Sequence, residues 1–166
     1  MRKDFLKRTN LPSCKIEELT ITPDTEKPTT KVDYKVDVLR YASKAGKRIF
    51  VPINTVHPFT DIPPKMENRI QPIRIRENTL EEDIFVLKLP EGYQIESIPQ
   101  EKVNMAPKMG SYSVEIIKSK TEITYKRRLL IKAIDLPAAD YEAFRNFYKE
   151  IAKADQMKLV LVEQKT

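Results

Sequence analysis

Residues 123–162 read ITYKRRLLIKAIDLPAADYEAFRNFYKEIAKADQMKLVLV, and the hydrophobic period changes twice within this run. The first part repeats every two residues, which predicts a strand over 123–134. From Pro137 onward the apolar residues recur at three and four, which predicts a helix over 137–154. The final part alternates again, so a closing strand is expected over 157–163. The stretch therefore predicts strand, helix and strand at this end of the chain.

The predicted strand over 123–134 carries a charge on its apolar face. Its in-phase residues are Ile123, Tyr125, Arg127, Leu129 and Ile131. Three placements would accommodate Arg127: the exposed end of the strand, a bulge, or a buried stem with its guanidinium reaching solvent. Lys126-Arg127-Arg128 is also the densest basic run, but neighbouring strand residues point to opposite faces. The run therefore cannot form a three-charge patch on one side, and anchoring an anion or an acidic partner loop is the less favoured interpretation.

Upstream of this stretch the pattern is that of many short strands. Strands are expected over 15–22, 31–41, 47–53, 83–89, 94–98 and 111–118. The strongest signal is the alternation at 31–38, where Val32, Tyr34, Val36 and Val38 share one face. Residues 83–89 are apolar on both faces, which predicts a central strand covered on both sides.

A proline-rich stretch separates the early strands from the later ones. Five prolines fall within residues 52–72, and proline lacks the N–H that a central strand must donate. We expect a long loop or a sheet edge there. Loops of this length inside a domain are uncommon and are often functional or laid over the surface.

The order of elements predicts a mainly β fold: an antiparallel β-sandwich, immunoglobulin-like or related, with one C-terminal α-helix followed by a last strand. Residues 1–14 are interpreted as an N-terminal extension or a linker from an upstream domain. Residues 15–166 are expected to form the sandwich domain, with 15–76 and 80–166 as two sub-parts in an alternative division.

Composition bounds the function further. The 166 residues carry a net charge of +6, and 40% are hydrophobic while 33% are charged. Bases alternate with acids instead of gathering on one face, so nucleic-acid binding is not expected. No apolar run approaches the ~20 residues of a membrane span. Three glycines leave no glycine-rich phosphate loop, and no cofactor is expected.

The sequence contains few residues that could support catalysis or bind a metal. Cys14 and His57 are the only cysteine and histidine, and neither context favours a nucleophilic pair. Glu81-Glu82-Asp83 and Glu17-Glu18 cluster acids without the loop spacing of a calcium site, so they are expected to face water. The sequence therefore predicts no enzyme, with no catalytic, cofactor-binding or metal-binding residue.

Aromatic side chains form two groups that could bind a ligand or fill a core. They are Tyr34 and Tyr41 on the alternating strand, and Tyr141, Phe144, Phe147 and Tyr148 on the predicted helix. Sugar-binding sandwiches present flat aromatic rings, but this chain has no tryptophan. The stripe of Tyr141, Phe144, Tyr148 and Ile151 must be covered to stabilise the helix, so the core is the preferred interpretation.

Several motifs together carry a resemblance to a known family. They are LPEGY at 89–93, IP at 98–99, GSYS at 110–113, RRLLIK at 127–132, PAADYEAFRNF at 137–147 and ADQMKLVLV at 154–162. In order and spacing they resemble the C-terminal β-rich domain, of unknown function, that follows the transglutaminase-like core in a group of exported Gram-negative bacterial proteins. The resemblance covers residues 80–165 well and 15–76 more loosely.

This resemblance implies a non-catalytic accessory β domain that packs on the upstream transglutaminase-like core and binds a protein or glycan partner. The family's Cys-His-Asp triad belongs to that core, and no motif here matches it. The resemblance further implies a periplasmic or cell-surface location as part of a longer parent, in which case Met1 is not the native start. The alternative interpretation is a free-standing carbohydrate-binding or adhesion module.

Overall fold

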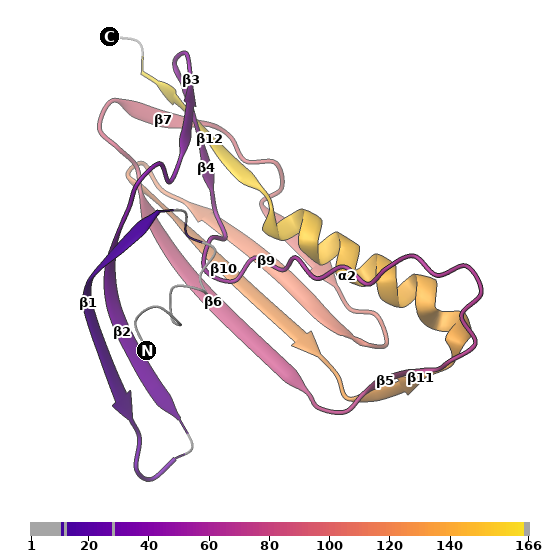
Figure 1. Cartoon of the computed structure of the whole chain (residues 1–166). Coiled ribbons are helices and arrows are strands. Elements are labelled where there is room, and N and C mark those ends of the chain that lie inside the picture. The colour runs from indigo at the N-terminus through magenta and orange to yellow at the C-terminus, as the bar shows by residue number, and fades with distance from the viewer. Residues whose placement is uncertain (1–10, 12, 28, 165–166) are drawn as a thin grey trace.

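The computed structural model describes residues 11, 13–27 and 29–164, and it is mainly β, as predicted (Figure 1). The sheets are antiparallel, and one C-terminal α-helix precedes the last strand. The elements are β1 (Cys14–Pro23), β2 (Thr30–Val38), β3 (Ser43–Ala45), β4 (Arg48–Pro52), β5 (Ile73–Ile75), β6 (Thr79–Lys88), β7 (Tyr93–Ser97), β8 (Lys102–Met105), β9 (Gly110–Lys118), β10 (Glu122–Ile131), β11 (Ile134–Leu136), the 3₁₀ turn η1 (Ala138–Asp140), α2 (Tyr141–Asp155) and β12 (Lys158–Glu163).

Two four-stranded sheets share the hydrophobic core in a sandwich-like arrangement. One has the order β6-β10-β9-β8 and the other β3-β4-β12-β7. The inward faces of β9 and β10 supply most of the large core side chains, including Tyr112, Tyr125 and Leu129, each at most 1% exposed. Leu159 and Leu161 of β12 join the same core from the second sheet. Period-two alternation thus produces one buried and one open face in each sheet.

Residues 53–72, the proline-rich segment, form the predicted long loop and run along α2 (Figure 1). The hydroxyl of Tyr141 donates to the carbonyl of Pro64 at 2.7 Å, and Arg145 Nε donates to the carbonyl of Pro63 at 3.1 Å. The Phe59 ring lies 5.1 Å from that of Tyr148. Helix side chains therefore satisfy the carbonyls that prolines leave without a sheet partner.

The strand with the strongest alternation belongs to neither sandwich sheet. β1 and β2 form a two-stranded hairpin of their own, which extends away from the body (Figure 1). The hairpin contributes no side chain to the buried core. The expected N-terminal extension falls mainly on residues outside the described ranges. Two of the sheets combine strands from both expected sub-parts, because β4 pairs with β12 and β5 with β11.

The expectation of a central strand at 83–89 was wrong. β6 lies at the edge of its sheet, and one of its faces is open, with Ile84 69% and Val86 56% exposed. Apolar residues on both faces of β6 therefore do not mean that both faces are covered. The short strands β3, β5, β8 and β11 carried too few residues for a period to be recognised.

Candidate functional site

The least expected feature of the structure is a buried group of charges centred on Arg127. This side chain on β10 is fully buried, so none of the three placements expected from the sequence is correct. Its guanidinium lies between the sheet and α2, where burying an unpaired charge would be prohibitive. Three carboxylates surround it, and we call the group the Arg127 cluster: Arg127, Glu81, Asp83 and Asp155, with His57, Tyr112 and Tyr125 bound to its carboxylates.

Three ion pairs hold Arg127. Its Nε donates to Asp155 Oδ1 at 3.0 Å, and its Nη1 donates to Glu81 Oε2 and Asp83 Oδ2, both at 2.9 Å. Asp155 is also fully buried, Asp83 is 9% exposed and Glu81 is 41% exposed. The cluster therefore opens from the core toward the β6 edge. Arg127 Nη2 is buried and has no hydrogen-bond partner among the described residues.

Asp155 joins four parts of the fold at once. Its Oδ1 accepts hydrogen bonds from the hydroxyls of Tyr112, at 2.6 Å, and Tyr125, at 3.5 Å. Its Oδ2 accepts from the backbone N–H of Phe59 in the proline-rich segment, at 2.9 Å. One carboxylate at the end of α2 thus fixes the helix to β9, β10 and the loop, and charge-assisted bonds of this kind are the stronger ones.

The outer end of the cluster is His57. Its Nδ1 lies 2.9 Å from Asp83 Oδ1, while the ring remains 57% exposed. Asn54 holds the turn that presents it, since its amide donates to the His57 carbonyl and its Oδ1 accepts from the His57 N–H. The imidazole is thus exposed, as expected, but it also links the proline-rich segment to β6.

Burial and the neighbouring carboxylates set the protonation of the cluster. Burial alone would lower the pKa of Arg127, but Asp155 and Glu81 outweigh it and raise that pKa, so the guanidinium stays charged. Burial, followed by the nearby Tyr125 and Asp155, raises the pKa of Tyr112 far above its usual value. Burial and Asp155 likewise raise the pKa of Tyr125. Both phenols therefore remain neutral donors in the folded chain.

These tyrosines predict a loss of stability in alkaline solution. A raised pKa in the folded state contributes stability that is complete below the unfolded value, near 10, and that decreases as the pH rises above it. Each buried phenol should lower the free energy of unfolding by about 1.4 kcal/mol per pH unit there. Denaturant unfolding at a series of pH values measures this slope. Tyr112→Phe should make it shallower, whereas an unchanged slope would contradict the assignment.

The other residues singled out in the sequence do not come together as a site. Within the described part of the chain, no hydrogen bond joins Cys14 to His57, whose ring binds Asp83 instead. Glu17 pairs with Lys35 on the hairpin surface. The described residues contain no group of three or more potential metal ligands. The expectation that Glu81-Glu82-Asp83 face water is wrong for Asp83, while Glu82 does lie outside and pairs with Arg128.

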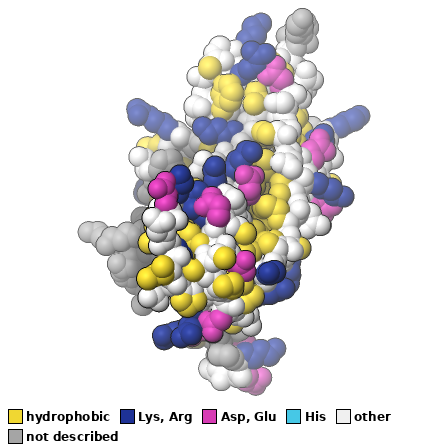
Figure 2. All heavy atoms as spheres, turned by 90° about the vertical axis from the view of Figure 1, so that its right-hand side faces the viewer, with side chains coloured by type: hydrophobic (Ala, Val, Ile, Leu, Met, Phe, Trp, Pro, Cys, Tyr) yellow, Lys and Arg dark blue, Asp and Glu magenta, His cyan; other side chains and the backbone are white. Residues whose placement is uncertain are grey.

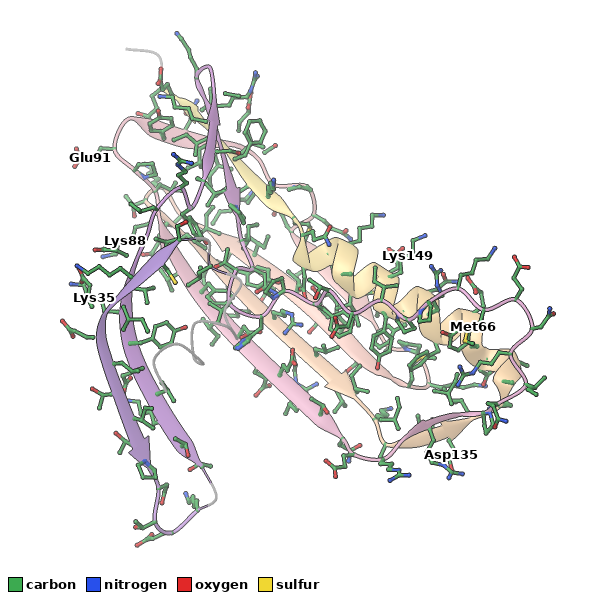
Figure 3. The ribbon with its side chains drawn as sticks, in the orientation of Figure 1. Lys35, Met66, Lys88, Glu91, Asp135 and Lys149 are labelled. Carbon is green, nitrogen blue, oxygen red and sulfur yellow. The ribbon has the colours of Figure 1, made fainter. Side chains whose placement is uncertain are left out.

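The aromatic groups divide differently from the prediction. Tyr141 and Phe147 are buried, and Phe144 and Tyr148 pack against the core, which confirms the core interpretation for the helix. Tyr41 also packs on the core, but Tyr34 is 36% exposed on the hairpin. Lys149, by contrast, projects from α2 away from the sheet (Figure 3).

Asp155 was missed because the helix was expected to end at residue 154, whereas α2 includes Asp155. The sequence did contain a signal, since the apolar stripe at 141, 144, 148 and 151 continues at the next step of four to 155. An acid in phase with the helix stripe and a base in phase with a strand face together indicate a buried pair. Neither the acid nor the base alone predicts a buried pair, because a single charged side chain at the end of a helix or strand can reach solvent.

The contacts of the Arg127 cluster hold several parts of the fold together. The cluster fixes β6, β10, α2 and the proline-rich segment to one another, and its carboxylates are already occupied by Arg127, the two phenols and a backbone N–H. The surface, by contrast, carries exposed apolar side chains that a partner could contact. Large apolar side chains are exposed on three separate elements: Ile21 and Tyr34 on the hairpin, Ile62, Met66 and Ile70 on the proline-rich segment, and Leu80, Ile84, Val86 and Ile117 on the open sheet face.

Charged and apolar side chains are interspersed on the surface. Figure 2 shows the side that carries α2 and the proline-rich segment, where hydrophobic patches lie between scattered basic and acidic groups. Met66 lies at the outer margin of that segment (Figure 3). No basic stripe is visible on this side. No helix in the described part of the chain has the length and apolarity needed to cross a membrane.

Comparison with protein families matches the larger part of the chain. A family model described as "Domain of Unknown Function with solved-structure structure (DUF3858)" covers residues 47–161. The match includes the Arg127 cluster and both four-stranded sheets except β3 and the last two residues of β12, and it excludes the hairpin of β1 and β2. No curated protein and no solved structure matches the chain significantly.

Proposed function

This chain belongs to the DUF3858 family of domains of unknown function, and we propose that it is a non-catalytic accessory β domain that packs on a transglutaminase-like core. The parent protein in this proposal is exported and works in the periplasm or at the cell surface. The observation that carries the proposal is the hairpin of β1 and β2, which lies outside the family match and has one poorly covered apolar face.

The hairpin has two unlike faces. A register shift between Ile16 and Glu18 brings four apolar pairs onto the same side: Cys14 with Val38, Ile16 with Val36, Leu19 with Tyr34, and Ile21 with Val32. The opposite side carries charges, including the ion pairs of Lys31 with Asp33 and Lys35 with Glu17. Six of the eight apolar side chains are half-buried, and Ile21 and Tyr34 are 41% and 36% exposed.

An isolated two-stranded hairpin is at best marginally stable in water. A hairpin with an apolar face of this size gains stability when another surface covers that face, because burying one large aliphatic side chain contributes about 1.5–3 kcal/mol. A docking arm that precedes the family domain would therefore fix it to a neighbouring domain. No observation on the structure favours a glycan, since the helix aromatics lie in the core.

The test takes a protein that carries both domains and produces its transglutaminase-like core as a separate chain. Titration calorimetry should show binding to this chain, and Ile21→Glu should weaken it at least tenfold because the substitution places a charge on the docking face. Thr22→Glu is the matched control, since Thr22 lies on the other face opposite Lys31. Absence of binding, or equal affinity of the two variants, would refute the proposal.

A further inference from the structure

The outer edge of β6, which pairs with no described strand, is unusually long and regular. β6 pairs with β10 over all ten of its residues without a register shift, and it contains no proline. Among the described residues, no backbone hydrogen bond crosses its outer edge. Natural proteins protect such edges with prolines, bulges or inward-pointing charges, because an open strand pairs readily with another strand.

The inward charges of β6 do not provide that protection here. Glu81 and Asp83 point toward the core side, but Arg127 binds both. Their charges are therefore compensated within the fold instead of repelling an incoming strand. No described strand occupies this edge, while its own acids are held in place and His57 and the hairpin residue Tyr34 interact with Asp83.

The outer face of β6 is apolar in its middle and charged on either side. Leu80, Ile84 and Val86 are 51%, 69% and 56% exposed. Glu82 and Lys88 lie on the same face, at the even positions of the strand. Lys88 forms no ion pair with any described residue, and it points away from the body of the protein (Figure 3).

This pattern is complementary to itself. When β6 pairs antiparallel with β6 of a second copy about a two-fold axis at Phe85, Ile84 faces Val86 of the other copy and Glu82 faces its Lys88. A two-fold axis at Ile84 or at Val86 would instead place a charge opposite an aliphatic side chain. The contact is isologous, so each pair occurs twice in one dimer.

We propose that this chain dimerises through β6, in the register centred on Phe85, and joins two sheets into one of eight strands. The occupant of the edge is a second copy because its charges and apolar residues match in this register. Cross-strand pairs are the unit of stabilisation in such a sheet, and like charges placed directly opposite are destabilising.

The experiment is sedimentation equilibrium on the whole chain over a wide concentration range. The unmodified chain should show a monomer–dimer equilibrium. Glu82→Lys and Lys88→Glu should each weaken it at least tenfold, because two attractive pairs become repulsive. An equal mixture of these two variants should associate again, and so should the double variant. The internal pair of Glu82 with Arg128 is lost in the double variant as well, so its recovery reports only the contact between copies.

Two further variants test the location of the contact. Ile84→Lys should abolish dimerisation, and it should fold because the side chain is 69% exposed. Ile117→Lys, on the same sheet face but on β9, should leave dimerisation unchanged. A chain that stays monomeric at every concentration would overturn the proposal. A dimer that tolerates the charge reversals, with circular dichroism showing folded variants, would overturn it equally.

Discussion

Replacing Arg127 by Met is expected to lower the free energy of unfolding by about 3–5 kcal/mol. The substitution keeps most of the volume of the side chain but leaves Asp155 fully buried without its cation. Asp83, only 9% exposed, loses the same partner. A domain of this size is typically stable by about 5–15 kcal/mol, so the variant should lose a large fraction of its stability. Urea denaturation followed by circular dichroism measures the change.

Arg128→Met is the matched control, one residue away on the opposite face of β10. Arg128 is 49% exposed and pairs with Glu82 at the surface, where an ion pair contributes at most about 1 kcal/mol. A second variant separates loss of the charge pair from loss of packing. The double replacement Arg127→Met with Asp155→Leu removes both buried charges, and it should recover part of the stability. A cost below about 1 kcal/mol for Arg127→Met alone would show that solvent reaches the cluster.

Phe147→Ala is expected to cost about 3–5 kcal/mol, because it opens a cavity between α2 and the sheet. Phe147 is 5% exposed, and its ring lies edge-on to Tyr148 at 5.9 Å between centroids. Phe144 is only partly buried, so Phe144→Ala should cost less. Thermal melting of the two variants compares these costs directly.

Lys149→Ala serves as the control on the exposed face of the same helix and should stay within about 0.5 kcal/mol. The competing interpretation makes the aromatic residues of α2 an exposed docking surface. It requires that Phe147→Ala melt like the unmodified chain and lose binding to a partner instead. A melting temperature unchanged by Phe147→Ala would therefore refute the assignment of α2 to the core.

The local periodicity of apolar residues was sufficient to predict the fold class. The alternating strand, the helix and the closing strand appear in the predicted order, although the strand expected over 123–134 ends at Ile131 and the α-helix expected from Pro137 begins at Tyr141, after a 3₁₀ turn. Such patterns depend on residues two to four apart, so the sequence alone contains them. The proline-rich segment was likewise predictable as a loop, because a proline removes a backbone donor wherever it stands.

Burial of charge was decided only by the tertiary structure. Arg127, Asp155 and Asp83 lie on three elements that are far apart in the sequence. Each would be an ordinary exposed charge if its element packed elsewhere in the fold. Their mutual neutralisation depends on how α2 crosses the sheet, which no local period records. The position of β6 at the edge was decided in the same way, since strand order depends on pairing partners. Sequence therefore determined which residues share a face, and tertiary packing determined which faces meet, because only the assembled sheets bring opposite charges within hydrogen-bonding distance.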